Sequence, residues 1–301
     1  WESDLTYEGE SVYNYLQVKE DDKEVYLSTN VLFGVQSVYV KDGSLTGMYY
    51  DYAMAAPLMA GVQEKDNLDI LILGMGTGTY ATQCSKYFDN LTIEGVEIDE
   101  DIIDLSHEYF HLSEDIPVTA YDGRAFLNAV DKTYDVIMVD AYQDITIPFQ
   151  MSSVEFFTLV KDHLKSDGVM VVNMNMRGQK EGSITDYLSD TIGSVFSEVY
   201  TVEVPRSTNR ELFASNNENM LKAFAENASK TDNEALRELM EKVSTNLIPW
   251  EKGELIMTDD KAPVELLGMR VIDDIIFDEV SYYKGIYEEE GIEGLMQGIG
   301  I

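Results

Sequence analysis

The amino-acid sequence predicts an α/β protein built on a parallel β-sheet, with a small β-rich region before the sheet and a helical region after it. From residue 69 onward, short apolar runs typical of buried strands alternate with helical stretches, and that alternation indicates a parallel sheet. A glycine-rich turn joins the first of these strands to the helix that follows it. We therefore expect an N-terminal β-domain at residues 1–60, an α/β domain at residues 61–215, and a helical appendage with the C-terminal segment at residues 216–301.

The N-terminal region is expected to form antiparallel strands. Tyr13–Val18 and Glu24–Leu27 lie on either side of the turn-like segment EDDK, and this pattern predicts a hairpin. Phe33–Val40 predicts a further strand, and the stretch LTGMYYDYAMAAPLM after it leads into a helix.

The central region contains the alternating elements. The expected strands are Ile70–Leu73, Leu91–Ile98, Val118–Asp122, Tyr134–Asp140 and Gly168–Met174, and the first two are followed by helical stretches at Tyr80–Phe88 and Asp101–Leu112. Val199–Val204 and Glu211–Ser215, joined by a short loop that contains Pro205, are expected to close the sheet as a pair. Residues 216–247 are charged and predicted to be helical, and residues 263–301 predict one or two helices.

The charge balance restricts the class of ligand. The chain has 21 basic and 56 acidic residues, a net charge of −35. A nucleic-acid-binding protein is not expected, because phosphate contacts require a basic patch. Such a field favours a small cationic substrate or partner, although an acidic surface also simply keeps a protein in solution.

The sequence gives several indications of the compartment. No uninterrupted apolar run reaches the roughly 18–20 residues that a membrane span requires, and no secretory signal is present. Cys84 is the only cysteine, which excludes an internal disulfide and is typical of a reducing compartment such as the cytoplasm. The chain begins at Trp1 rather than at methionine, so we expect a domain cut from a longer protein, in which a membrane segment could precede Trp1.

Residues 107–111 read HEYFH and match the H-E-x-x-H pattern of zinc proteases. In the predicted helix Asp101–Leu112, both histidines lie off the apolar stripe, on what should be a solvated face. The only other histidine, His163, belongs to a different helical stretch. The stripe consists of Ile102, Leu105, Tyr109 and Leu112. We therefore expect no metal site.

The most informative stretch is ILILGMGTGTY, residues 70–80. Its glycines lie between a strand and a helix, where the backbone can approach a ligand closely and the helix N-terminus offers free N–H groups. Their spacing departs from the dinucleotide pattern G-x-G-x-x-G and fits the nucleoside loop of the class I S-adenosylmethionine fold better. We expect Gly74, Gly76, Thr77 and Gly78 to contact a nucleoside.

Acidic residues end the strands that follow this loop, at the edge where open α/β sheets bind ligands. Glu97 follows the glycine loop by about 20 residues, the spacing of an acid that binds ribose hydroxyls. Asp122 with Gly123 can meet an adenine amine, or the pair can simply form a turn. Asp140 can take a proton from an amine, and Asp144 follows in the next loop.

These stretches, in this order, resemble the spermidine synthase family of aminopropyltransferases, from about Tyr13 to Ser215. YNYLQV is similar to the family's Y-Q-x-I-x-V, GVQSV to its G-x-x-Q, and YYDYAMAAPL to its Y-H-E-M-x-x-H-x-P-L. LGMGTGT resembles its G-G-G-D-G-G loop, GVEID its V-E-I-D, YDG its D-G, and YDVIMVDAYQD its Y-D-V-I-x-D-S-S-D-P. The chain looks most similar to bacterial spermidine-synthase-like domains that are often attached to membrane segments.

The resemblance implies a Rossmann-like, seven-stranded domain of the class I S-adenosylmethionine type behind a small N-terminal β-domain. It implies transfer of an aminopropyl group from decarboxylated S-adenosylmethionine, a co-substrate and not a permanent cofactor, to a polyamine such as putrescine. The products would be spermidine and methylthioadenosine. Family members are commonly dimers or tetramers, so we expect a homo-oligomer.

By position, the resemblance assigns Glu97 to the ribose, Asp122 to the adenine, and the role of catalytic base to Asp140. The positions that it assigns to the substrate are Gln36, Tyr49, Asp51 and Asp144.

Some positions depart from the family. Thr77 stands where the family has an aspartate aimed at the aminopropyl ammonium, and threonine cannot pair with a cation as a carboxylate does. Intact S-adenosylmethionine would therefore be tolerated. The other departures are Tyr50 for histidine, Asp51 for glutamate, Asn14 for glutamine, and one extra residue between Asp140 and Asp144.

Two other functions therefore stay open. Thr77 favours a different S-adenosylmethionine-dependent transferase, of methyl or 3-amino-3-carboxypropyl groups. The accumulated departures favour a non-catalytic nucleoside-binding or sensor domain of a membrane protein.

Overall fold

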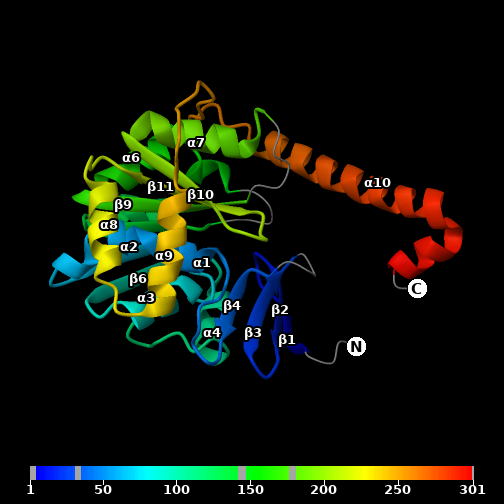
Figure 1. The fold of residues 1–301 in the computed structure, drawn as a ribbon, viewed down its shortest axis with the longest axis horizontal. Helices are drawn as coiled ribbons and strands as arrows, with labels where there is room; N and C mark the ends of the chain where they lie inside the picture. Colours follow the sequence, from blue (N-terminus) through cyan, green and yellow to red (C-terminus); the bar gives the residue numbers. More distant parts are fainter. Residues whose placement is uncertain (1–4, 31–34, 142–146, 176–180, 300–301) are drawn as a thin grey trace.

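The computed structural model describes residues 5–30, 35–141, 147–175 and 181–299. It contains a small N-terminal sheet, a larger sheet with helices on both faces, and a long C-terminal helix that projects from the body (Figure 1). The α/β architecture predicted from the sequence is confirmed.

The N-terminal sheet has four antiparallel strands in sequential order. They are β1 (Leu5–Glu10), β2 (Tyr15–Glu20), β3 (Glu24–Thr29) and β4 (Ser37–Val40). The predicted hairpin is β2–β3, and β4 covers the end of the third expected strand. Strand β1 was not predicted from the sequence, because no residue of this strand is fully buried and the apolar alternation is correspondingly weak.

The larger sheet has the order β12-β10-β11-β9-β8-β5-β6-β7. Its strands are β5 (Leu68–Leu73), β6 (Leu91–Glu97), β7 (Val118–Ala120), β8 (Tyr134–Val139), β9 (Leu164–Asn175), β10 (Glu198–Glu203), β11 (Asn209–Ser215) and β12 (Ile248–Pro249). The strands from β9 to β7 run parallel, whereas β10, β11 and β12 pair antiparallel. The seven predicted strands are present, and β12 adds a two-residue edge.

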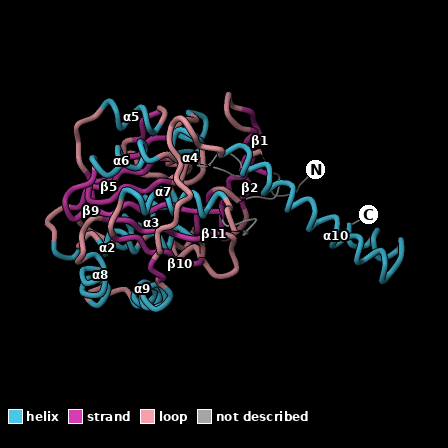
Figure 2. The backbone as a smooth tube through the Cα atoms, turned by 90° about the horizontal axis from the view of Figure 1, so that it is seen from above, coloured by secondary structure: helices cyan, strands magenta, loops and turns pink. Residues whose placement is uncertain are grey.

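Helices cover both faces of this sheet (Figure 2). One face carries α1 (Tyr49–Ala53), α2 (Ala55–Met59), α3 (Thr79–Tyr87), α8 (Met220–Ser229) and α9 (Glu234–Asn246). The other carries α5 (Gly123–Ala129), α6 (Val154–Asp162) and α7 (Ile184–Val195). Two short 3-10 turns are η1 (Val62–Glu64) and η2 (Phe149–Met151). Within the segment expected to be an appendage, Phe224 and Met240 are buried in the same core as Ile70.

Helix α4 (Glu100–Glu108) packs against the N-terminal sheet, with Ile102 and Leu105 in the core of that sheet. The predicted helix extended to Leu112, but the chain leaves the helix at Tyr109, and His111 has a left-handed backbone with φ 55°. The two histidines of HEYFH therefore do not share one helix face. The described residues contain no cluster of three or more side chains suited to a metal ion.

The C-terminal helix α10 spans Val264–Ile299 and is interrupted at Gly291. Its first turns pack on the body through Val264, Leu267 and Val271, and the rest projects away from the sheet (Figures 1 and 2). Within the described parts of the chain, no helix combines the length and apolar character that would let it cross a membrane.

Candidate active site

A cavity of about 740 Å³ lies at the carboxyl edge of the parallel strands, where the N-terminal sheet and the β10–β11 hairpin meet this edge. This volume falls within the range of small-molecule sites. The predicted site residues in its lining are Gln36, Tyr49, Gly74, Gly76, Glu97, Asp122, Gly123 and Asp140.

The glycine loop forms the floor of the cavity beside β5. Gly74 has φ 85°, and a Cβ atom there would lie 2.5 Å from the carbonyl oxygen of Asp140. Only glycine satisfies both the backbone conformation and this close approach. Glycine at this position therefore lets the loop pack closely against the backbone at Asp140, and contact of the loop with a nucleoside stays a prediction.

Glu97 ends β6 and is 8% exposed. Its carboxylate accepts hydrogen bonds from the backbone N–H groups of Gly76 (2.8 Å) and Ile98 (2.9 Å). Burial raises the pKa of Glu97, and the backbone donors oppose that rise. The side chain is thereby held in one orientation at the cavity wall, where a carboxylate can accept from ribose hydroxyls.

Asp122 lines the cavity and also begins helix α5. Its Oδ1 atom accepts a hydrogen bond from the Ala125 N–H (2.8 Å), the geometry of an N-cap. Asp122 therefore has the turn-forming role considered for it and also lines the cavity, and its contact with adenine stays a prediction.

Asp140 lies directly after β8, and two side chains each donate a hydrogen bond to its carboxylate. The Tyr49 hydroxyl donates to one carboxylate oxygen (2.6 Å), and the Asn173 amide donates to the other (2.9 Å). Burial raises the pKa of Asp140 to about 7, although both hydrogen bonds act to lower it. A carboxyl with this pKa can accept and return a proton near neutral pH.

Glu211 lies next to the site, in the strand beside Asn173, and was not predicted from the sequence. It lies opposite Asn173 in the β9–β11 ladder, is fully buried, and neither carboxyl oxygen has a hydrogen-bond partner in the described chain. Burial and the charge of Asp140 raise the pKa of Glu211 well above its usual value, so we expect a neutral acid. The only sequence signal was an acid at the start of an otherwise apolar strand.

A second missed residue is Asp99, which connects the N-terminal sheet to the site. Its carboxylate accepts hydrogen bonds from the Ser11 hydroxyl (2.6 Å) and the Asn14 amide (2.7 Å), and it caps α4. Asn14 itself lines the cavity. The contact fixes one wall of the cavity against the parallel sheet.

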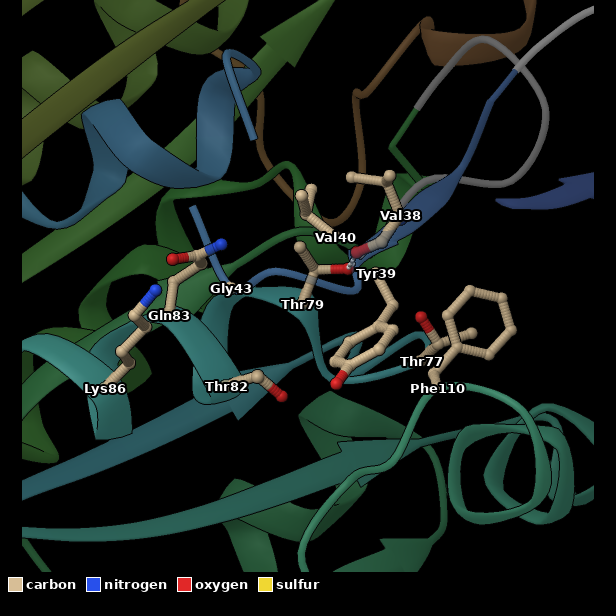
Figure 3. A pocket seen from close by; sticks show the side chains of 10 residues that line it. All are labelled: Val38, Tyr39, Val40, Gly43, Thr77, Thr79, Thr82, Gln83, Lys86 and Phe110. Carbon is tan, nitrogen blue, oxygen red and sulfur yellow. Dashed lines mark hydrogen bonds between the residues drawn. The ribbon is translucent and has the colours of Figure 1, made fainter. Parts of the chain in front are cut away.

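Three predicted residues lie outside this lining. The Thr77 side chain lines a separate cavity of about 30 Å³, together with Thr79, Gln83 and Phe110 (Figure 3). Its hydroxyl has no hydrogen-bond partner among the described residues. Gly78 is the residue before α3, facing Leu112.

The third is Asp51, whose carboxylate accepts hydrogen bonds from the N–H groups of Thr46 (3.2 Å) and Gly47 (2.6 Å). It fixes the loop before α1, the helix that carries Tyr49. Asp144 lies outside the described residues.

The fold is one that spermidine synthases share with a methyltransferase-like protein. Solved structures with this fold include a probable spermidine synthase from Corynebacterium glutamicum ATCC 13032, with a TM-score of 0.62, 17% identity, and coverage of 84% of this chain and 98% of that one. Spermidine synthase from Thermotoga maritima has a TM-score of 0.62 and 19% identity, covering 77% of this chain and 80% of that one. Human methyltransferase-like protein 13 in complex with SAH has a TM-score of 0.52 and 19% identity, and the match covers 67% of this chain and 95% of that one.

Sequence comparison narrows this class. Residues 49–225 match the spermine/spermidine synthase domain. The chain is 53% identical over 317 residues to a probable polyamine aminopropyl transferase of Bifidobacterium longum (strain NCC 2705), covering 99% of this chain and 70% of the relative. It is 26% identical to a polyamine aminopropyltransferase of Vibrio vulnificus (strain CMCP6), and the match covers 88% of this chain and 92% of the relative. The chain belongs to the spermine/spermidine synthase family, which confirms the resemblance seen in the motifs.

Proposed function

We propose that the chain is an aminopropyltransferase that uses decarboxylated S-adenosylmethionine as donor and a polyamine such as putrescine as acceptor. The observation that carries this proposal is Asp140, oriented by Tyr49 and Asn173 in a cavity that also contains Glu97 and Asp122. The names of the relatives and membership of the family support it.

The donor would lie along the carboxyl edge of β5 and β6. Glu97 would hold the ribose hydroxyls, and Asp122 with Gly123 would meet the adenine. Gly74 and Gly76 would let the backbone approach the nucleoside closely. Acidic groups in the lining also favour the positive sulfonium of the donor.

The reaction requires a neutral amine. The acceptor ammonium would lose one proton to the Asp140 carboxylate. The nitrogen lone pair would then form a bond to the methylene carbon beside the sulfonium, while the carbon–sulfur bond breaks and its electron pair stays on sulfur. Methylthioadenosine leaves, and the proton later passes from Asp140 to water. The chain contributes positioning and the base.

The acceptor would lie between Asp140 and the residues Gln36 and Tyr49. Asp51 would act through the loop that it holds, not through contact with the substrate. Asp144 stays a predicted substrate contact. The predicted contact of Thr77 with the donor could be made only by its backbone from the observed loop, since its side chain lines the smaller cavity.

Product identification tests this function. The chain is incubated with putrescine and decarboxylated S-adenosylmethionine, and methylthioadenosine and spermidine are quantified by mass spectrometry. We expect both products in equal amounts. Nucleoside binding seen by calorimetry without any product would support a sensor domain and contradict the proposal.

The lack of a carboxylate at position 77 supports a second candidate, transfer from intact S-adenosylmethionine. The same incubation with the intact donor separates the alternatives. S-adenosylhomocysteine would indicate methyl transfer, and methylthioadenosine from this donor would indicate transfer of a 3-amino-3-carboxypropyl group.

A further inference from the structure

The lining of the large cavity contains one basic residue among its acidic residues. Glu97, Asp122 and Asp140 make the described lining acidic, but Arg206 is also part of it and is its only basic residue. The residue is exposed, and no hydrogen bond or ion pair joins its side chain to another described residue. By contrast, Arg210 on the same hairpin forms an ion pair with Glu203 (2.6 Å).

The backbone at Arg206 is also unusual. The Ser207 N–H donates to the Val204 carbonyl (3.2 Å), which closes a turn with Pro205 and Arg206 at its centre. Arg206 has φ 62°, and the third position of such a turn normally belongs to glycine or asparagine. A residue with a large side chain in this conformation is disfavoured, and such outliers cluster at ligand-binding sites.

Hydrogen bonds connect the β10–β11 hairpin to Asp140, the proposed base. Asn209, three residues after Arg206, donates a hydrogen bond to the Asn173 side chain (2.8 Å), and Asn173 donates to Asp140 (2.9 Å). Arg206 therefore lies on the hairpin that is joined to Asp140 through Asn173, and both Arg206 and Asp140 line the same cavity. The nucleoside side, with Glu97 and Asp122, is built from other loops.

A cation in the wall of this cavity opposes the binding of a substrate that carries only positive charge. It favours a substrate that brings an anionic group beside its amine. A guanidinium fits a carboxylate with two parallel hydrogen bonds, and that geometry also fixes the orientation of the carboxylate.

We propose that Arg206 forms a carboxylate subsite and that the enzyme prefers an acceptor amine that carries a carboxylate, a diamino acid, over a plain diamine. This inference rests on the proposed function. The bonds made and broken at the reacting amine are unchanged, with its proton going to Asp140 and the electron pair of the carbon–sulfur bond going to sulfur. The carboxylate takes part only in binding.

The test compares two acceptors that differ by one group. Putrescine and ornithine share the same diamine skeleton, and ornithine adds a carboxylate. With the full chain and saturating decarboxylated donor, kcat/KM for each acceptor is measured from methylthioadenosine release. We expect wild type to favour ornithine, and Arg206→Gln to lower kcat/KM for ornithine by about tenfold to hundredfold while putrescine is unchanged or improved.

Arg210→Gln is the matched control, because it removes an arginine from the same hairpin outside the cavity, and it should leave the acceptor ratio unchanged. Arg206→Gly separates recognition from folding. Glycine suits the turn, so this variant should unfold at a higher temperature than wild type and still lose the preference for ornithine.

Each outcome decides the proposal. It is overturned if wild type uses putrescine but not ornithine, or if Arg206→Gln leaves the acceptor ratio unchanged. A change in the KM of intact S-adenosylmethionine instead of the acceptor ratio would assign the subsite to the donor and overturn the acceptor claim. If no methylthioadenosine forms at all, the proposed function fails. The subsite is then decided by calorimetry, where tighter binding of ornithine than putrescine, lost in Arg206→Gln, upholds it and equal binding rejects it.

Discussion

Asp140 combines burial with two hydrogen-bond donors, and this combination predicts a pH dependence. Its pKa of about 7 means that the carboxylate needed as base is formed as the pH rises through neutrality. We expect kcat/KM to rise with pH around this value. Tyr49→Phe removes a donor that lowers the pKa of Asp140, so the midpoint of the pH–rate profile should move to higher pH.

Tyr52→Phe is the control for this change, because Tyr52 lies on the same helix and does not line the cavity. An identical midpoint in wild type and Tyr49→Phe would show that the hydroxyl does not stabilise the ionised base.

Glu211 predicts a pH dependence of stability. Its folded pKa lies well above the unfolded value near 4.5, so above about pH 4.5 the folded state holds a proton that the unfolded state releases. The free energy of unfolding should therefore fall as the pH rises, by up to about 1.4 kcal/mol per pH unit from this group. Glu211→Gln removes that titration, so the melting temperature of the variant relative to wild type should increase from pH 5 to pH 8.

Thermal unfolding of Glu211→Gln, wild type and Glu218→Gln across this range checks the prediction. Glu218 is exposed, so its replacement should follow the wild-type curve. Parallel curves for all three proteins would mean that Glu211 does not hold its proton in the folded state.

At the scale of single residues, the sequence could predict the acids that end strands. Glu97 and Asp140 follow apolar runs, and parallel strands bring their carboxyl ends to one edge. The direction of the Thr77 side chain could not be predicted, because it depends on the packing of β4 against the loop. Glu211 could not be recognised either, because its lack of partners is a property of the folded core.

The loop between β5 and α3 determines how closely backbone and ligand can approach. Gly74→Ala would place a Cβ atom 2.5 Å from a backbone oxygen at φ 85°. We expect a loss of at least about 2 kcal/mol of stability, because backbone, unlike a flexible side chain, cannot move aside cheaply. Nucleoside affinity should also fall.

Gly61→Ala is a matched control, with φ 83° and no heavy atom within 4 Å of the added Cβ. Urea unfolding gives the free energy of unfolding of both variants. The difference between them separates the cost of the contact between the added Cβ and the Asp140 backbone from the cost of the positive φ. Equal destabilisation would contradict the assigned role of Gly74.

Among the elements, helices α8 and α9 could be predicted as helices, but their packing surface could not be predicted from the sequence. Their periodicity predicted helices, but an apolar stripe does not reveal which surface it covers. In the structure Phe224 and Met240 bury that stripe on the face of the sheet that also carries α3. The strands of the large sheet were easier to predict, because strands buried on both faces have continuous apolar runs.

For the whole molecule, the excess of acids predicts a dependence on salt. A net charge of −35 attracts cationic substrates over long range, and that attraction is screened above about 0.1 M salt. We expect the KM for putrescine to rise several-fold between 0.02 M and 0.5 M sodium chloride, with kcat nearly constant. A KM independent of salt would mean that only local contacts attract the amine.

The homo-oligomer expected from the family stays a prediction for the whole molecule. Sedimentation velocity on the full chain at micromolar concentration would measure it. We expect a dimer or tetramer, and a single species of 34 kDa, the mass of one chain, would contradict that expectation.

The most direct measurement of the central claim is the rate of methylthioadenosine release by Asp140→Asn, with decarboxylated S-adenosylmethionine as donor. Asparagine keeps the size of the side chain and cannot take a proton from the acceptor. We expect turnover to fall by at least about 100-fold, with the calorimetric affinity for methylthioadenosine within a few-fold of wild type. Full turnover in Asp140→Asn would contradict the assignment of Asp140 as the base and the mechanism built on it.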